Sequence, residues 1–225
     1  MAVMQQGKLQ ERKKRVRAML RVLKRLYPDS KAELRYSNNW ELLVAVILSA
    51  QCTDKRVNEV TKKLFKKYRS LRAYLGVSQK EFEQDIKPTG FYRNKAKHIL
   101  GAARVVKEKF SGVLPKTIEE MITIPGVGRK TANVVLANAY GIHEGIAVDT
   151  HVRRLVLKFD LSDYKDPVQI ERDLMAFIPK KDWRYVNHQM VMYGRYHCRA
   201  RKHDCKKHPL THIYPQAAQM WPKAK

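Results

Sequence analysis

The stretch Ile124-Pro125-Gly126-Val127-Gly128-Arg129-Lys130-Thr131-Ala132 decides the fold of this chain. Gly126 and Gly128 permit a positive φ and let another molecule approach the backbone closely, because glycine has no Cβ. Residues 131–140 continue as a helix, whose first amides and positive dipole end suit a phosphate. The stretch therefore predicts a helix-hairpin-helix motif with an amine, that of Lys130, at the start of its second helix.

The first helix of this motif begins at Thr117, where Thr117 and Glu120 have the spacing of a capping box. Pro125 ends that helix, since proline lacks the backbone donor that a helix interior needs. A tight turn between two packed helices is the simpler alternative. A nucleotide-binding P-loop fits poorly, because the GxxxxGK[ST] spacing is missing and no strand pattern precedes the glycines.

Length and charge limit the kinds of protein that this chain can be. The 225 residues suffice for one large domain or two small ones. Lys and Arg number 46 against 21 Asp and Glu, and the resulting net charge of +25 favours a polyanionic partner, DNA or RNA. No apolar run of about 18 residues could span a membrane, and no signal region follows the basic N-terminus. We therefore expect a cytoplasmic protein. Only three cysteines are present, so we expect no disulfide framework.

Helical periodicity runs through almost the whole sequence, and alternating strand patterns are absent. In residues 12–27 apolar side chains recur three or four positions apart and basic side chains fill most of the other positions, which predicts an amphipathic helix. Its basic face fits either a solvated surface or a direct contact with DNA. Residues 40–50 are apolar nearly all round and predict a buried helix that Asn38 or Asn39 caps. Further helices are expected at about 55–68, 79–86, 93–109, 151–158, 167–177 and 182–194. The sequence therefore predicts an all-α fold.

Three motifs in order along the chain, at residues 42–54, 124–132 and 148–151, resemble endonuclease III of the helix-hairpin-helix DNA glycosylase superfamily. The resemblance runs from about residue 28 to about residue 205. It implies an all-α fold of two helical lobes with a DNA-binding cleft between them. A helical barrel lobe would span 32–142 and contain the helix-hairpin-helix. Residues 1–31 and 143–225 would form a second lobe with a degenerate cluster loop.

The resemblance assigns catalysis to Lys130 and Asp149. A neutral lysine amine can attack the sugar C1′, expel a damaged base and form a Schiff base, which permits β-elimination of the 3′ phosphate. An ionised carboxylate can accept a proton or stabilise positive charge on the sugar. Locally, Lys130 also fits a simple phosphate contact, and Asp149 fits an N-cap of the following helix.

Reaching a base inside a duplex requires extruding the nucleotide. The resemblance places Gln51 in the resulting gap and Phe91 as an apolar wedge. A polar helix end for Gln51, and a core anchor for Phe91, remain the structural alternatives. The residues expected to contact DNA are Gln51, Phe91, Gly126, Val127, Gly128, Arg129, Thr131, His151 and Arg199.

A loop near the C-terminus departs from the family pattern. Members usually bind a [4Fe-4S] cluster through C-x6-C-x2-C-x5-C, whereas this chain has Cys198, Cys205, His208 and Tyr214 at those positions. Four thiolates are the usual requirement, so we expect no cluster and no other cofactor. Zinc on Cys198, Cys205, His208 and His212 is the alternative, although that spacing is not a recognised finger. The basic side chains Arg199, Arg201, Lys202, Lys206 and Lys207 could still hold phosphate.

The combined interpretation is a bifunctional DNA glycosylase and abasic-site lyase that removes oxidised pyrimidines in base excision repair. Its partner would be double-stranded DNA with damaged bases or abasic sites. We expect a monomer that associates with the nucleoid and does not bind a membrane. Two alternatives stay open. One is a monofunctional mispair glycosylase, which typically lacks the lysine, and the other is a non-catalytic DNA-binding protein on the same scaffold.

Overall fold

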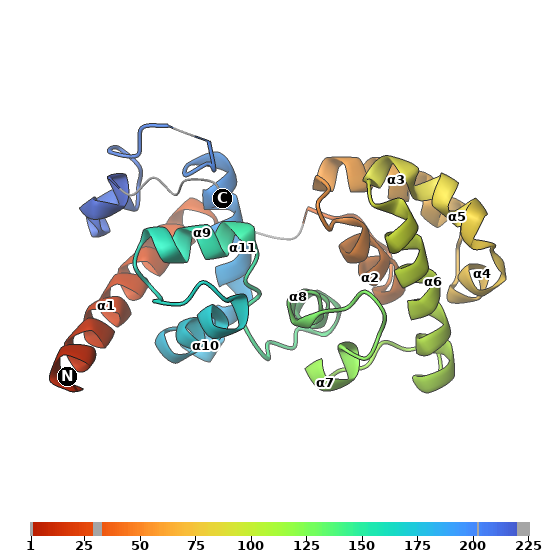
Figure 1. Cartoon of the computed structure of the whole chain (residues 1–225), viewed down its shortest axis with the longest axis horizontal. Coiled ribbons are helices and arrows are strands. Elements are labelled where there is room, and N and C mark those ends of the chain that lie inside the picture. Colours follow the sequence, from red (N-terminus) through yellow and green to blue (C-terminus); the bar gives the residue numbers. More distant parts are fainter. Residues whose placement is uncertain (1, 29–32, 202, 220–225) are drawn as a thin grey trace. The chain divides into compact units, whose positions relative to one another are not determined.

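A computed structural model describes residues 2–28, 33–201 and 203–219 of the chain (Figure 1). These residues form eleven α-helices and four short 3-10 turns, and no strand occurs among them, which confirms the all-α prediction. In this part of the chain no helix is both long and apolar enough to cross a bilayer. The chain divides into two compact units, one of residues 1–31 and 145–225 and the other of residues 32–144.

The unit of residues 32–144 is built around one buried helix. Its helices are α2 (Asn39–Leu48), α3 (Asp54–Lys67), α4 (Leu71–Gly76), α5 (Gln79–Ile86), α6 (Tyr92–Lys109), α7 (Ile118–Met121) and α8 (Arg129–Tyr140), with the 3-10 turn η1 (Lys87–Thr89). Residues 42–48 of α2 are all buried, and α2 packs against α3, α6 and α8. Asn38 is the N-cap, since its side chain accepts a hydrogen bond from the Glu41 amide. The continuous apolar pattern of α2 thus follows from its neighbours on several sides.

The other unit joins the two ends of the chain. It contains α1 (Ala2–Leu26), α9 (Thr150–Lys158), α10 (Pro167–Phe177), α11 (Trp183–Tyr196), η2 (Lys180–Asp182), η3 (Thr211–Ile213) and η4 (Pro215–Ala218). Helix α1 packs against α10 and α11, and α9 packs against α11. Val16, Met19, Leu20 and Leu23 of α1 are buried at the expected three- and four-residue spacing. The apolar stripe of this N-terminal helix therefore belongs to the core of its unit.

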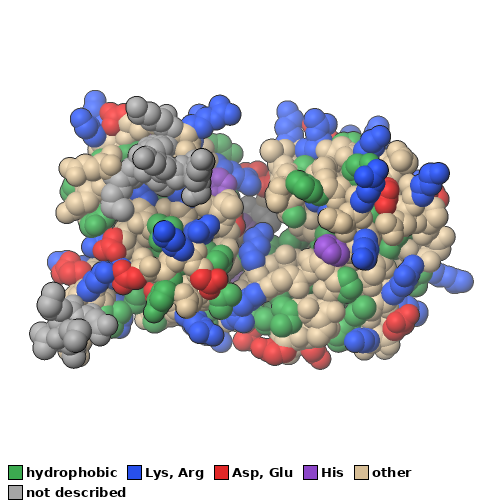
Figure 2. Space-filling view, in the orientation of Figure 1, with side chains coloured by type: hydrophobic (Ala, Val, Ile, Leu, Met, Phe, Trp, Pro, Cys, Tyr) green, Lys and Arg blue, Asp and Glu red, His purple; other side chains and the backbone are tan. Residues whose placement is uncertain are grey.

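Part of the basic face of α1 is used within the fold. Arg12 is only 6% exposed, and its guanidinium donates hydrogen bonds to the carboxylates of Asp160 and Asp163. Arg15 donates to the carbonyl oxygens of Phe159 and Asp160. These two cations hold α1 on the turn that follows α9. Lys14, Arg17, Arg21 and Arg25 of the same helix remain exposed, and Figure 2 shows Lys and Arg side chains over the surfaces of both units.

The ion pairs of Asp163 with Arg12 and Lys8 predict a pH-dependent contribution to the stability of the fold. Hydrogen bonds from Arg12 and Lys8 hold the pKa of the Asp163 carboxyl well below its usual range. Its contribution to the free energy of unfolding is therefore present above the unfolded pKa of about 3.9, and it is lost as the pH falls toward the depressed folded value. Asp163→Asn should lower the Tm slightly at about pH 7, and the difference from the parent should shrink below about pH 4. The effect is small because this side chain is 58% exposed.

Thermal unfolding of both proteins across that pH range measures this contribution. Glu108→Gln, at an exposed position of α6, removes one carboxylate elsewhere and should follow the parent curve throughout. A Tm difference for Asp163→Asn that stays constant from neutral to acid pH would contradict the role of the ion pair.

Candidate functional site

The glycine stretch forms the predicted hairpin between α7 and α8. Thr117 is the N-cap of α7, where its hydroxyl accepts from the Glu120 amide and donates to the Glu120 carboxylate. After α7 the Val127 amide donates to the Ile124 carbonyl oxygen over 3.0 Å, and the Val127 side chain is buried. Val127 therefore anchors the hairpin in the core and leaves the glycines on either side of it at the surface.

The structure requires glycine at one of the two glycine positions of the hairpin and not at the other. Gly126 has a φ of +80°, and a Cβ there would lie 2.8 Å from the Cβ of His98. Gly128 has a φ of −89°, and a Cβ there would meet nothing within 4 Å. The fold itself thus demands glycine at 126. At 128 it demands nothing, so the missing side chain only leaves the N-terminus of α8 open to a ligand.

This contrast gives a matched pair of substitutions. Gly126→Ala should cost about 1–3 kcal/mol of stability from the positive φ alone, with the contact to His98 in addition. Gly128→Ala should cost less than about 1 kcal/mol, yet weaken DNA binding about tenfold by obstructing a phosphate. Thermal unfolding and fluorescence anisotropy with a labelled duplex separate the two effects. Unchanged affinity in Gly128→Ala would remove the N-terminus of α8 from the DNA contacts.

Lys130 occupies the second position of α8, and its side chain is exposed. Arg129 and Thr131 beside it are half-buried. The N-cap is Gly128, which has no side chain to cap the helix, so the positive end of the α8 dipole faces the surface next to this amine. The structure therefore presents the predicted nucleophile to solvent at a helix terminus that attracts anions.

Gln51 and Phe91 share an unusual backbone conformation in the same unit. Gln51 has a φ of 52° and Phe91 a φ of 46°, which non-glycine residues adopt uncommonly. Both side chains are exposed, and Phe91 is 64% exposed. Phe91 is thus no core anchor, and an apolar ring of this size held outward on a strained turn is typical of a functional position.

A buried lysine that the sequence analysis did not single out joins the two turns. Lys95 of α6 is only 4% exposed, and its ammonium donates hydrogen bonds of 2.8 Å to the carbonyl oxygens of Leu48 and Thr89. Leu48 ends α2 just before Gln51, and Thr89 ends η1 just before Phe91. Burial lowers the pKa of Lys95. The sequence feature that could have indicated its burial is its position in the apolar stripe of α6, four residues before the buried Ile99.

Asp149 lies in the other unit, at the N-terminus of α9. Its carboxylate accepts a 2.8 Å hydrogen bond from the Val152 amide, which confirms that this side chain is the N-cap. The preceding segment is held by Asn187 of α11, whose amide donates to the Ala147 carbonyl oxygen over 2.7 Å. The half-buried carboxylate is thereby held in one orientation.

His151, in the first turn of α9, packs against α11. A Cβ on Gly194 would come within 2.8 Å of the His151 Nδ1, so glycine makes room for the imidazole. Burial lowers the pKa of His151, although the charge of Asp149 opposes this shift. Arg154 donates to the carbonyl oxygens of Gly194 and Cys198 and so joins α9 to the end of α11.

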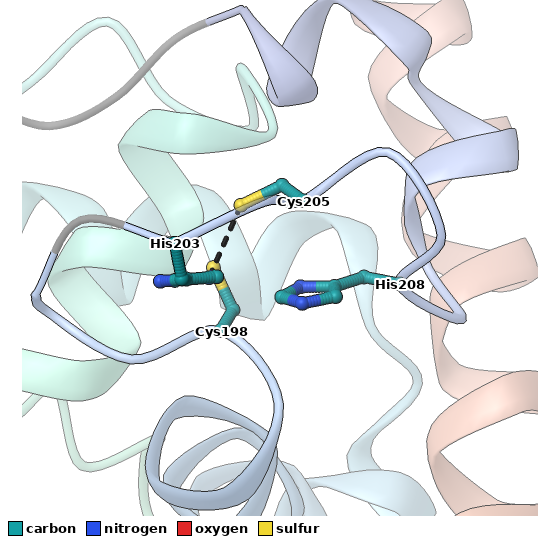
Figure 3. Close-up of side chains that lie close together, drawn as sticks. All are labelled: Cys198, His203, Cys205 and His208. Carbon is teal, nitrogen blue, oxygen red and sulfur yellow. Dashed lines mark hydrogen bonds between the residues drawn. The ribbon is translucent and has the colours of Figure 1, made fainter.

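The C-terminal loop brings Cys198, His203, Cys205 and His208 together, with one potential ligand atom from each within 4.8 Å of all the others (Figure 3). The chain therefore contains a group that could hold a metal ion. His203 takes the place that the sequence analysis gave to His212. The loop folds back so that the His203 and His208 rings stack at 4.9 Å, whereas His212 is exposed on η3 outside the group.

A buried lysine and several exposed basic side chains surround this group. The buried ammonium of Lys158 donates a 2.8 Å hydrogen bond to the Cys205 sulfur. Burial raises the pKa of Cys198, and Lys158 opposes that shift. The cations Arg199, Arg201, Lys206 and Lys207 of the loop are exposed, as a phosphate contact requires, while Lys202 lies outside the described residues.

The folded hairpin and the exposed amine beside it define a helix-hairpin-helix protein of the kind that handles DNA. Residues 44–180 match the HhH-GPD superfamily of base excision DNA repair proteins, and the chain belongs to this family. The match covers both the hairpin with Lys130 and the N-cap Asp149. It confirms the resemblance that the three motifs indicated.

Individual relatives agree with this assignment. The chain is 48% identical to endonuclease III of Synechocystis sp. over 93% of its length and 96% of that protein. It is 46% identical to endonuclease III of Bacillus subtilis over 84% of its length and 86% of that protein. Among solved structures, a trapped covalent endonuclease III–DNA intermediate is similar with a TM-score of 0.88 and 43% identity, over 92% of this chain and 97% of that one.

Proposed function

We propose that this chain is a bifunctional DNA glycosylase and abasic-site lyase that removes oxidised pyrimidines in base excision repair. The exposed amine of Lys130, in the first turn of α8 behind a hairpin with an unobstructed glycine, carries this proposal. The similar structure of a covalent endonuclease III–DNA intermediate supports it, because covalent chemistry on DNA needs a nucleophile at such a surface. A protein that acts on genomic DNA would work at the nucleoid.

Lys130 would carry both chemical steps. Its neutral amine attacks C1′ of the extruded nucleotide, the C1′–N bond breaks, and the base departs with the electron pair and a proton. Nζ loses one proton. The C1′–O4′ bond then breaks, O4′ takes the electron pair and a proton, and the nitrogen lone pair forms an iminium between Nζ and C1′. The iminium withdraws electrons, so that a C2′ proton is removed and the C3′–O bond breaks, which releases the 3′ phosphate. Water then hydrolyses the imine and regenerates the lysine.

Asp149 would assist as an anion. The sugar gains positive charge as the base leaves, and a carboxylate held rigidly by its helix cap can stabilise that charge or receive the amine proton. The hydrogen bonds from Val152 and Asn187 described above supply this rigidity. A preorganised charge is more effective than a mobile one because it needs no rearrangement during the reaction.

Extrusion of the nucleotide would use the two strained turns. Gln51 would enter the gap and Phe91 would act as the apolar wedge between bases. Lys95 is then a positioning residue, because its two hydrogen bonds tie both turns to α6. Arg129, Thr131 and the backbone of residues 126–128 would bind the phosphates on the same unit, and His151 and Arg199 would contribute from the other.

We further infer that no [4Fe-4S] cluster is bound. Such a cluster requires four thiolates as a rule, and the C-terminal group offers two thiols and two imidazoles. Tyr214, at the position of the fourth family cysteine, is a phenol and no substitute for a thiolate. The proposed reaction therefore depends on no step at a cluster.

The test uses a labelled duplex with one oxidised pyrimidine at a defined position. We expect release of the free base and strand cleavage at that site without added alkali. Cleavage that appears only after alkali would indicate the monofunctional alternative. Binding without either product would indicate a non-catalytic protein. An undamaged duplex of the same sequence is the control and should stay intact.

A further inference from the structure

The four donors of the C-terminal group have the separation that a single metal ion requires. With metal–sulfur bonds of about 2.3 Å and metal–nitrogen bonds of about 2.0–2.1 Å, tetrahedral ligand atoms lie roughly 3.3–3.8 Å apart. The four atoms here lie within 4.8 Å of one another, and the Cys205 sulfur already lies 3.1 Å from the His203 Nε2. A small contraction of the loop would bring all four ligand atoms to the distances of a tetrahedral metal site.

One nitrogen in the group has no hydrogen-bond partner. The Nδ1 of His208 is buried and accepts or donates no hydrogen bond among the described residues. A buried polar atom without a partner is costly and calls for a ligand or a bound ion. Figure 3 shows the His208 ring directed toward Cys198 and His203. This nitrogen is thus an independent sign that something occupies the space between the four side chains.

A buried cation lies beside the two cysteines. Lys158 is buried next to the two cysteines and donates to the Cys205 sulfur over 2.8 Å. A buried ammonium requires a compensating charge, and a metal deprotonates the cysteines that bind it. Arg154 adds order by donating to the Cys198 carbonyl oxygen. Hydrogen bonds of this kind, to the ligands and to their backbone, are typical of the shell around a metal site.

We propose that Cys198, His203, Cys205 and His208 bind one zinc ion in a closed tetrahedral site. Two thiolates and two imidazoles are among the usual ligand sets of structural zinc. A four-iron cluster puts each ligand on a different iron and so spreads its ligands further apart than a single ion does. The site has no open position for water, and its role is therefore structural.

The proposed ion orders a basic loop. All four ligands lie within residues 198–208, and the loop begins where α11 ends. The same loop exposes Arg199, Arg201, Lys206 and Lys207. Removing the ion should loosen these cations and the unit that holds them, without altering Lys130 or its hairpin in the other unit.

Elemental analysis of the tag-free full-length protein, produced with both zinc and iron supplied, tests the proposal. We expect about one zinc per chain and no acid-labile sulfide. Cobalt(II) added after removal of the zinc should give the intense visible bands of a tetrahedral thiolate site. Chelation should lower the Tm by about 5–10 °C, since a tightly bound ion stabilises only the folded chain. Protein without metal, or with iron and sulfide on the same residues, would overturn the proposal.

Matched variants identify the ligands. His203→Ala and Cys198→Ser should lose the zinc and the cobalt spectrum, whereas His212→Ala and Cys52→Ser remove the same chemical groups elsewhere and should keep both. His203 is half-buried, so its variant should fold even if Cys198→Ser does not. Zinc that survives His203→Ala but is lost in His212→Ala would refute this ligand set. Because Lys130 lies in the other unit, abasic-site cleavage by the parent protein is scored separately from its metal content.

Discussion

Lys130→Ala should not form the borohydride-stable crosslink to an abasic duplex that the parent protein forms. Borohydride reduces an iminium between Nζ and C1′ to a permanent amine, and alanine offers no nitrogen to make one. Base release should fall about 10³-fold or more, since nucleophile removal is among the most damaging changes to an enzyme. The Tm should stay near that of the parent, because the side chain is exposed and alanine is a good helix former.

Lys130→Arg is the matched control for this experiment. Arginine keeps a positive charge in the first turn of α8, and hence any simple phosphate contact, but its guanidinium stays protonated and cannot attack C1′. Duplex affinity should therefore stay close to the parent value while the crosslink disappears. A crosslink that persists in both variants would show that another amine is the nucleophile. Weaker binding in Lys130→Ala alone, with both binding and the crosslink kept in Lys130→Arg, would support a phosphate contact instead.

Asp149→Asn should lower the rate of base release about 10²-fold or more while leaving the fold intact. Asparagine caps a helix about as well as aspartate, so the hydrogen bond from the Val152 amide is retained. Only the negative charge is lost. Single-turnover base release and thermal unfolding of the same preparation separate the charge from the cap.

The control for the cap is Asp166, which accepts a 3.0 Å hydrogen bond from the Gln169 amide at the start of α10. Asp166→Ala should cost about 1 kcal/mol of stability and leave base release unchanged. Parental activity in Asp149→Asn would reduce Asp149 to an N-cap like Asp166. A rate loss in Asp166→Ala as large as that in Asp149→Asn would attribute both effects to lost stability.

The local features of the site were predictable because they depend on neighbours in sequence. The hairpin follows from Pro125 and two glycines, and the caps at Thr117 and Asp149 follow from residues three positions apart. The short helix α4 was missed, since its six residues are too few to show a helical period. Helix α1 begins at Ala2, ten residues before the start of the periodic pattern, and α7 already ends at Met121, before Pro125. The boundaries of α3, α5, α6, α9, α10 and α11 agree with the helical periodicity to within two residues.

The C-terminal group was only partly predictable. Two cysteines and His208 stood out from their spacing, but the fourth residue of the group is His203, and His212 lies outside it. The loop between Cys198 and Cys205 has no periodic pattern, so its path is decided by packing of the imidazoles and by Lys158 of α9. Such contacts cannot be predicted from the spacing of residues in the sequence.

By itself, the sequence determined the all-α class, the family and the identity of the amine and the carboxylate proposed for catalysis. These depend on periodicity, turn chemistry and short motifs, which act over a few residues. Only the tertiary structure decided that Lys95 ties the turns of Gln51 and Phe91 together, that Arg12 serves the fold, and that His203 completes the cysteine group. Most of these contacts join residues far apart in the chain, and the His203 contact depends on the path of an irregular loop, so they exist only after the helices have packed.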